Sequence, residues 1–284
     1  MIKRNLLIAI LILCSIGIIK GQTVSDSLAI VSAQWKVESP QKGIIHKYAS
    51  IPRLYQGTQS VSLIEIEPGA GLKVDIAVSD EMKETSRIAS EHRGIAAING
   101  SYFDMKRGNS VCFLKVGNQV VDTTTLSECK LRVTGAMHVH KGKIKLIPWS
   151  RQIEKEYEGE TGMVLASGPL MLKDGQICDW NSCGANFIRT KHPRSAVATT
   201  KEGKILLITV DGRFPEQAEG VNIPELAHLI RILGGEDALN LDGGGSTTLW
   251  LSGASDDGVV NYPCDNGRFD HAGERKVPNI LYIH

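Results

Sequence analysis

The fold of this chain is decided by the stretch ILLITVDGR (205–213), continued by NIPELAHLIRILGG (222–235) and DALNLDGGGS (237–246). Residues 205–210 are apolar throughout, which is typical of a strand covered on both faces. The next segment predicts a helix, because Asn222 is a candidate N-cap, apolar residues recur at helical spacing, and Gly234 and Gly235 stop it. Residues 238–241 then predict a second short strand, so the stretch forms a strand-helix-strand unit.

Two aspartates follow the ends of these predicted strands. If the strands run in the same direction in one sheet, Asp211 and Asp242 meet at one edge, where open α/β sheets bind ligands. Either aspartate alone is more typical of a simple turn before glycine. The pairing, and the three glycines that follow Asp242, favour a site.

The glycine run Gly243, Gly244 and Gly245, closed by Ser246, allows backbone N–H groups to approach an anion such as phosphate. The run lacks the lysine of a phosphate-binding P-loop and the glycine spacing of a dinucleotide site, so nucleotide binding is disfavoured. The structural alternative is a tight bend packed against neighbouring backbone.

The rest of the chain is rich in predicted strands, at 30–37, 60–67, 72–78 and 95–98, with one helix at 81–92. Turn residues near 117–118, 141–143, 173–175 and 202–203 predict hairpins. No repeat or linker divides the chain. We therefore expect an α+β (mixed α/β) fold, with a large mixed β-sheet core, few helices and the strand-helix-strand unit near the C-terminus.

Composition restricts the class of protein. The 284 residues are 42% hydrophobic and 22% charged, with a net charge of +1, which excludes the broad basic surface of a general nucleic-acid or membrane-surface binder. Residues 1–21 carry two cations and then an apolar run shorter than the roughly 20 residues of a membrane span. We expect a signal peptide there, cleaved after Gly21, with 22–284 as a single domain that is secreted, periplasmic or at the cell surface, without membrane attachment. An uncleaved anchor is the weaker alternative.

Export makes disulfides permissible. Cys178 with Cys183, and Cys112 with Cys129, are close enough in sequence to bridge locally. This leaves one thiol over, Cys264 unless it pairs with one of the others, and a buried, inert thiol is favoured there over a catalytic one. His138 and His140 lie on one face of a predicted strand. A third zinc ligand is missing, so a solvated strand face is favoured over a metal site.

Further polar residues lie at predicted strand ends. Asn99 follows one apolar strand, and Ser167 and Gly168 follow another. Arg194 begins an alternating strand; a buried arginine there requires an anion, either a protein carboxylate or a ligand phosphate. Glu274 and Arg275 precede the last strand, where a salt-bridged edge is the alternative interpretation.

These segments carry a family resemblance. The motifs are AAINGSYFD (96–104), ASGPLM (166–171), HPRSAVA (192–198), LITVDGR (207–213), LNLDGGGSTTLW (239–250) and ERKVPNILYI (274–283). In this order they resemble the phosphodiester glycosidase domain family, over about residues 95–284. The segment 22–72 matches only loosely.

The resemblance implies an exported hydrolase that cleaves a sugar-1-phosphodiester, for example of N-acetylglucosamine, into free sugar and a phosphomonoester. Its partner is then a glycan or sugar-phosphate substrate. The residues that match family motifs are assigned as follows: Asp211, Asp242 and Glu274 as the catalytic carboxyl groups; Arg194, Arg213, Arg275, Gly243, Gly244, Gly245 and Ser246 for the phosphate; Asn99, Ser167 and Gly168 for the substrate.

Two other functions remain open from the sequence. One is a glycan-binding protein of the same fold without catalysis, against which the low aromatic content of 5% counts modestly. The other is a metal-dependent phosphodiesterase in which Asp104, Asp211 and Asp242 hold a divalent ion. The glycosidase reaction requires no cofactor, although a divalent cation such as Ca²⁺ is compatible with these carboxylates.

Overall fold

The computed structural model of the chain describes residues 23–117, 119–157, 159 and 161–284. The signal peptide expected at 1–21 lies outside these residues, so its prediction is untested. In the described part of the chain, no helix has both the length and the apolar character that a membrane crossing requires.

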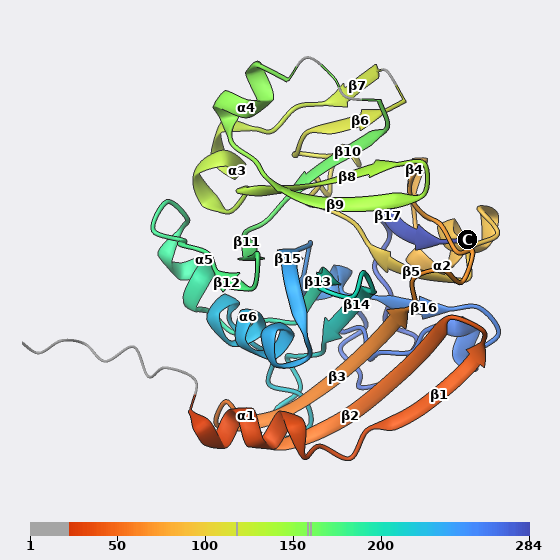
Figure 1. The fold of residues 1–284 in the computed structure, drawn as a ribbon, viewed down its shortest axis with the longest axis vertical. Coiled ribbons are helices and arrows are strands. Elements are labelled where there is room, and N and C mark those ends of the chain that lie inside the picture. The colour runs from red at the N-terminus through yellow and green to blue at the C-terminus, as the bar shows by residue number, and fades with distance from the viewer. Residues whose placement is uncertain (1–22, 118, 158, 160) are drawn as a thin grey trace, which may run out of the picture.

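The described strands form three sheets, and each strand pairs with its neighbours in antiparallel fashion (Figure 1). The largest sheet has eight strands in the order β1-β2-β3-β14-β13-β15-β11-β12. Its strands are β1 (Lys36–Gln41), β2 (Ile44–Leu54), β3 (Gly57–Ile66), β11 (Leu170–Lys173), β12 (Gln176–Ile177), β13 (Arg194–Thr200), β14 (Ile205–Val210) and β15 (Gly235–Asn240).

Two smaller sheets complete the fold. A five-stranded sheet has the order β7-β6-β10-β8-β9 and a four-stranded sheet the order β16-β5-β17-β4. Their strands are β6 (Leu114–Val116), β7 (Gln119–Asp122), β8 (Gly135–His140), β9 (Lys143–Pro148), β10 (Met163–Ser167), and β4 (Val74–Lys83), β5 (Ala96–Asn99), β16 (Leu249–Leu251), β17 (Val277–Ile283). The fold is therefore dominated by β-sheet, as expected, but the core is divided among three sheets.

The described helices are short. They are α1 (Val24–Val31), α2 (Thr85–Glu91), α3 (Leu126–Leu131), α4 (Arg151–Lys155), α5 (Ala185–Arg189) and α6 (Ile223–Ile232), with 3-10 turns η1 (Gly244–Ser246) and η2 (Asp256–Gly258). Figure 1 shows α3 and α4 beside the five-stranded sheet and α6 beside β15.

The segment β14–α6–β15 places two strand ends at the same edge of the large sheet. Strand β13 lies between β14 and β15 and is antiparallel to both, so β14 and β15 run in the same direction. The helix begins where the sequence indicates: the Asn222 side chain accepts a hydrogen bond from the Glu225 amide, and the Glu225 carboxylate accepts one from the Asn222 amide. This capping box fixes the start of α6.

Two buried clusters hold the sheets together. One lies between the large sheet and helices α1 and α6, with Leu206, Ile208, Leu226 and Ile230 among its members. The other draws side chains from all three sheets. The loops at the edge where the sheets meet are consequently held on a rigid base.

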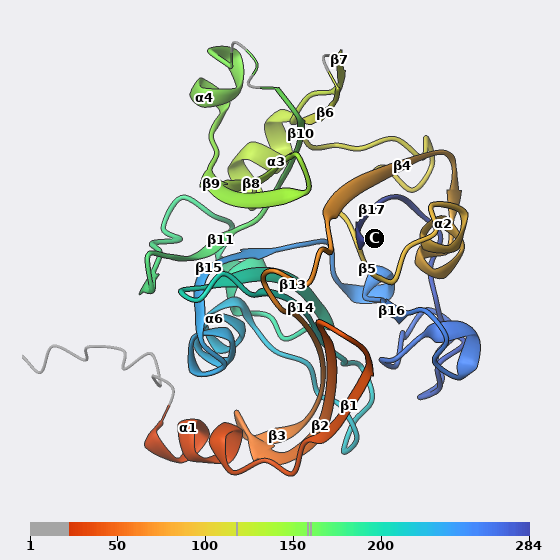
Figure 2. The same cartoon turned by 45° about the vertical axis from the view of Figure 1, so that its right-hand side comes forward.

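The N-terminal part differs from the sequence prediction. Residues 30–37 do not form a strand: α1 ends at Val31, and β1 begins at Lys36. The capping box of Thr23 and Asp26 starts this helix and outweighs the β-branched residues that suggested a strand. Strands β1, β2 and β3 are strongly curved (Figure 2), with register shifts in the β1–β2 and β2–β3 ladders.

The predicted disulfides are absent from the described residues, where all five cysteines are free. Cys112 is fully buried in a cluster with Phe113 and Trp149, whereas Cys129 lies half-buried on α3. Cys178 packs against the cluster shared by the sheets. Cys183 lies in a turn and donates its amide proton to the Trp180 carbonyl.

Candidate functional site

The three sheets meet around Asp242, two residues beyond the end of β15. The amide of Asp242 donates to the Gly100 carbonyl at 3.0 Å, and its carbonyl accepts from Asn99 Nδ2 at 2.7 Å. Asn99 ends β5, so the four-stranded sheet holds the backbone of Asp242 from both sides. The backbone from which the Asp242 side chain extends is therefore fixed in position.

Asn99 is a positioning residue. Its Oδ1 accepts from Ser195 Oγ at 2.6 Å and from the Thr248 amide at 3.1 Å. The side chain is fully buried. Its polar atoms thus connect β5, β13 and the segment after Asp242, and the expected contact of Asn99 with the substrate stays a prediction.

Asp242 is half-buried, and the charges of Arg132 and Arg275 act on its carboxyl group. Its Oδ1 accepts from the Gly243 amide at 2.9 Å. Burial raises the pKa of Asp242, against the opposing effects of the Ser246 hydroxyl and the guanidinium groups of Arg132 and Arg275. Raised carboxyl pKa values of this kind are common where a carboxyl group takes part in chemistry.

The glycine turn after Asp242 is covered by two arginines. A methyl group on Gly244 would lie 2.8 Å from Arg213 Nη2, and one on Gly245 would overlap the guanidinium of Arg275 and the carboxylate of Asp265. The absence of a side chain at both glycines permits this close approach. The turn thus presents two guanidinium groups beside a carboxylate.

Three amides of the turn, those of Gly243, Gly244 and Ser246, donate to groups of the protein and are not free for the anion cradle that the sequence predicts. Gly243 donates to the side chain of its neighbour Asp242, Gly244 to the Pro193 carbonyl at 2.9 Å, and Ser246 to the Gly243 carbonyl at 3.3 Å. These N–H groups are used within the protein. The positive charge at the turn comes instead from Arg213 and Arg275.

Arg213 has a strained backbone and an exposed side chain. Its φ of 70° lies in the left-handed region that residues other than glycine rarely adopt. Among the described residues, the only hydrogen bond from its guanidinium goes to Cys264 Sγ at 3.7 Å. The remaining donors are available for an anion.

Arg132 is a cation of this site that the sequence analysis missed. It donates to both oxygens of Glu128, at 2.6 and 3.0 Å, and its guanidinium lies 3.5 Å from the centre of the Tyr102 ring. Its side chain is only 21% exposed. The four-residue spacing of Glu128 and Arg132 resembles an ordinary surface pair on a helix, so sequence alone gives no signal for its place near Asp242.

Ser167 and Gly168 form part of the framework. The Ser167 hydroxyl donates to the Asn240 carbonyl at 2.9 Å. The Gly168 carbonyl accepts from Tyr102 Oη at 2.5 Å and from Asn240 Nδ2 at 2.9 Å. Because these groups are occupied and Ser167 is fully buried, they join the five-stranded sheet to β15 rather than present polar groups to a substrate.

Asp211 lies at the same sheet edge but in a separate environment. Its side chain is fully buried and accepts from Ser60 Oγ at 2.6 Å, Asn261 Nδ2 at 2.8 Å and the Tyr262 amide at 3.0 Å. Burial raises the pKa of Asp211 to about 6. No hydrogen bond between described residues joins it to Asp242. The expected carboxylate pair is therefore replaced by one site carboxylate and one internal carboxylate.

Arg194 does not meet an anion. It is 2% exposed, and its guanidinium donates to the carbonyls of Val221, Phe187 and Thr190 at 3.2, 3.0 and 2.9 Å. Burial lowers its pKa to about 10. Three carbonyl oxygens thus accept from Nε and Nη2 in place of an anion, and the expected contact of Arg194 with phosphate stays a prediction.

Glu274 faces helix α2. Its carboxylate accepts from the Ser86 amide at 3.0 Å and from Ser86 Oγ at 2.5 Å. Burial raises its pKa, against the effect of these hydrogen bonds. This contact joins the segment before β17 to the first turn of α2, and the catalytic role expected of Glu274 stays a prediction.

The aspartates proposed as metal ligands contact different parts of the protein. Asp104 accepts from the amides of Lys106 and Arg107 in a surface turn, whereas Asp211 is enclosed as described above. Within the described residues, no group of three His, Cys, Asp or Glu side chains has an arrangement that holds a metal ion. His138 Nε2 donates to the Thr161 carbonyl oxygen at 3.0 Å.

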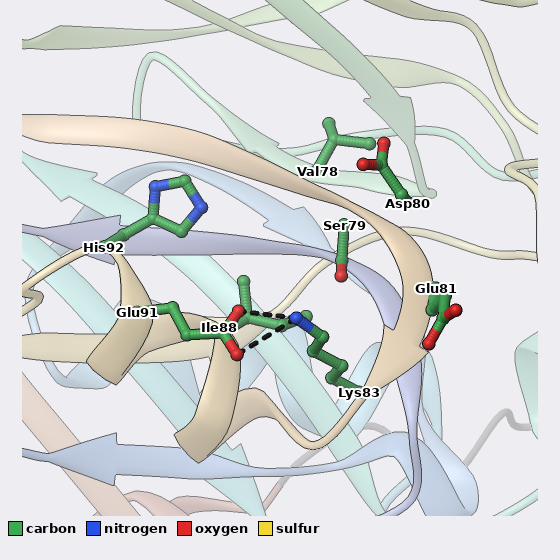
Figure 3. Close-up of a pocket in the computed structure, with 8 residues that line it drawn as sticks. All are labelled: Val78, Ser79, Asp80, Glu81, Lys83, Ile88, Glu91 and His92. Atoms are coloured by element: carbon green, nitrogen blue, oxygen red, sulfur yellow. Dashed lines mark hydrogen bonds and ion pairs between the residues drawn. The ribbon is translucent and has the colours of Figure 1, made fainter.

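A cleft of about 340 Å³ lies elsewhere, between β4 and α2 (Figure 3). Its lining residues are Val78, Ser79, Asp80, Glu81, Lys83, Ile88, Glu91 and His92. Figure 3 shows Lys83 and Glu91 paired across it. Lys83 Nζ donates to Glu91 Oε1 at 3.0 Å and to Oε2 at 2.7 Å. None of the predicted site residues lines this cleft, so it is distinct from the Asp242 site.

Solved structures resemble the fold of this chain. A catalytic domain of zebrafish N-acetylglucosamine-1-phosphodiester alpha-N-acetylglucosaminidase, auto-inhibited by its pro-peptide, has the same fold, with a TM-score of 0.65 and 20% identity over 88% of this chain and 87% of that one. A hypothetical protein from Synechocystis gives a TM-score of 0.59 at 15% identity, over 88% of this chain and 63% of that one.

Curated proteins match over a shorter segment. The mouse N-acetylglucosamine-1-phosphodiester alpha-N-acetylglucosaminidase is 34% identical over 102 residues, and the human protein is 30% identical over 102 residues. Each match covers 35% of this chain and 18% of the relative's length. The sequence profile of the phosphodiester glycosidase family matches residues 92–284, more than half of the chain. The chain therefore belongs to the phosphodiester glycosidase family.

Proposed function

We propose that this chain hydrolyses a sugar-1-phosphodiester, releasing the sugar and leaving a phosphomonoester. The observation that carries the proposal is the half-buried carboxyl group of Asp242 beside a glycine turn covered by Arg213 and Arg275. A carboxylate next to an anion-binding surface matches a substrate whose reacting carbon is bonded to a phosphate. The family membership of residues 92–284 supports the same reaction.

The two arginines bind the phosphate group. Guanidinium groups match phosphate oxygens in geometry and stay charged at all physiological pH values. They stabilise the negative charge that develops on the leaving phosphate as the C1–O bond breaks. Because phosphate leaves more readily than an alcohol, the reaction depends on these cations more than on a strong general acid.

Asp242 acts at the sugar carbon. In its ionised form the carboxylate stabilises the positive charge of the oxocarbenium-like centre and directs water to C1. The water oxygen forms the new bond to C1, the C1–O bond breaks, and the bridging oxygen leaves with the phosphomonoester. The proton of the water passes to the Asp242 carboxylate.

N-acetylglucosamine is the sugar to test first, because the relatives in mouse and human are named for it. We also propose that the protein is exported, since residues 1–21 have the charge and apolar pattern of a signal peptide. Sequencing the N-terminus of protein recovered outside the cytoplasm tests export: a start at Gln22 supports it, and an intact Met1 contradicts it.

The function is tested with a panel of sugar-1-phosphodiesters in ¹⁸O-labelled water. We expect free sugar carrying ¹⁸O, and we expect Asp242→Asn to lower kcat by at least about a thousandfold. Asp174→Asn is the matched control, because this exposed aspartate lies in the turn between β11 and β12.

Two outcomes contradict the proposal. Label that appears in phosphate shows cleavage of the P–O bond, and hence a phosphodiesterase. Retention on a glycan column without release of sugar from any member of the panel shows a binding protein.

A further inference from the structure

The guanidinium of Arg275 is already paired with a carboxylate. Asp265 Oδ1 accepts from Arg275 Nε at 3.0 Å and from Arg275 Nη2 at 2.5 Å. The Asp265 side chain is 37% exposed and that of Arg275 is 24% exposed. One carboxylate oxygen thus takes two donors that lie in the plane used for phosphate recognition.

This pair lies on the glycine turn itself. A side chain on Gly245 would overlap both Arg275 Nη2 and Asp265 Oδ1. Cys264, the neighbour of Asp265, accepts from Arg213 Nη1 at 3.7 Å. The Asp265 carboxylate therefore lies at the turn where the proposed function places the substrate phosphate, close to both arginines.

Asp265 is held by few contacts. It belongs to residues 259–276, which contain no helix or strand, and its amide donates to the Gly273 carbonyl at 3.2 Å. Among the described residues, the Asp265 side chain has no hydrogen-bond partner other than Arg275. An ion pair this exposed adds little net stability. Exchange of its carboxylate for another anion therefore costs little free energy.

The charges allow such an exchange. A carboxylate and a phosphodiester each carry one negative charge, and both offer oxygens to a guanidinium. Replacement of one by the other leaves the net charge around Arg275 unchanged. A released Asp265 side chain already has access to water.

We propose that Asp265 is an internal competitor of phosphate, whose carboxylate occupies Arg275 and is displaced when the phosphate group of a substrate binds. This inference rests on the proposed function for the location of the phosphate. It assigns Asp265 a role in setting substrate affinity and product release, without contact with the reacting carbon. Removal of its charge then strengthens phosphate binding.

The experiment titrates inorganic phosphate into the full chain at fixed pH and ionic strength, followed by calorimetry or ³¹P NMR. We expect Asp265→Asn to lower the Kd for phosphate by about threefold to fivefold, the factor that the loss of one exposed competing ion pair provides. Asp270→Asn is the matched control: this acid lies on the same segment and accepts from Asn266 Nδ2 and the Ala272 amide, not from Arg275. Arg275→Met should abolish binding.

A second variant separates charge from folding. Asp265→Glu keeps the charge and should bind phosphate as the wild type does, with a similar unfolding temperature. If Asp265→Asn binds phosphate as tightly as Asp270→Asn does, or more weakly, the inference is wrong. The ion pair of Asp265 then only holds residues 259–276 in place. A collapse of kcat in Asp265→Asn during sugar release also overturns it, because that result assigns Asp265 to the chemistry.

The outcomes also separate this inference from the proposed function. Release of sugar by the wild type, with an unchanged phosphate Kd in Asp265→Asn, contradicts the proposed role of Asp265 and leaves the proposed glycosidase function intact. Tighter phosphate binding by Asp265→Asn, with no release of sugar by any form, supports the competitor and contradicts the glycosidase.

Discussion

At the scale of single residues, Asp211 and Asp242 show how environment separates two similar positions. Each follows a strand of the same sheet, and the two strands run in the same direction. Asp211 is enclosed by Ser60, Asn261 and Tyr262, whereas Asp242 is half-buried beside Arg132 and Arg275. The sequence places both at one edge but does not show which carboxyl group remains open.

Asp211 makes stability depend on pH. Burial raises its pKa from 3.8 to about 6, so the protonated form contributes stability that is fully present below pH 3.8 and lost as the pH rises through 6. The contribution amounts to about 3 kcal/mol. Asp211→Asn is neutral at every pH, and its Oδ1 still accepts from Asn261 and Tyr262. We expect this variant to lose that pH dependence in urea unfolding between pH 4 and 7.

The same variant tests the role of Asp211 in the reaction. Because its carboxylate contacts only protein groups, we expect Asp211→Asn to retain release of sugar within about tenfold of the wild type. A wild-type slope of stability against pH, or loss of activity in a variant that is still folded, would contradict this assignment.

At the scale of secondary structure, the sequence predicts an element correctly where its capping and apolar residues match the face that the fold buries. Helix α6 begins at its predicted cap, and the apolar run 205–210 is strand β14. Residues 30–37 were misread because the capping box of α1 lies upstream of them, at Thr23 and Asp26. For Glu274, the sequence gives no indication that its partner is Ser86, which is 188 positions away.

Glu274 stabilises the start of α2, and a double-mutant cycle tests this role. We expect Glu274→Ala and Ser86→Ala each to lower the free energy of unfolding by about 1 kcal/mol. Because the two side chains share one interaction, the double variant should lose less than the sum of the single losses. Turnover should stay within about threefold of the wild type. Additive losses of stability, or a large fall in kcat at unchanged stability, would instead return Glu274 to the active site.

At the scale of the whole molecule, the site exists only where three sheets come together. Asn99 comes from the four-stranded sheet, Asp242 follows the eight-stranded sheet, and Arg132 follows α3 beside the five-stranded sheet. The motifs around Asn99 and Asp242 are visible in the sequence. Arg132 was missed because its effect on Asp242 and its contact with Tyr102 arise from tertiary packing, which no local sequence pattern encodes.

This convergence predicts a shift in the pH profile when Arg132 is replaced. Its guanidinium opposes the effect of burial on the pKa of Asp242, so Arg132→Met should raise that pKa further. Since Asp242 acts in its ionised form, the acidic limb of kcat/KM should move to higher pH. At acidic pH the rate should fall by on the order of tenfold, and it should recover towards alkaline pH.

Lys130→Met is the matched control. Lys130 is an exposed cation in the last turn of α3, so this substitution also removes one positive charge, but away from Asp242. Its pH profile should match that of the wild type. An equal loss of rate at every pH in Arg132→Met would show that Arg132 binds the substrate without tuning Asp242. An equal shift in both variants would trace the effect to net charge, and the contact of the five-stranded sheet with the site would then have no part in catalysis.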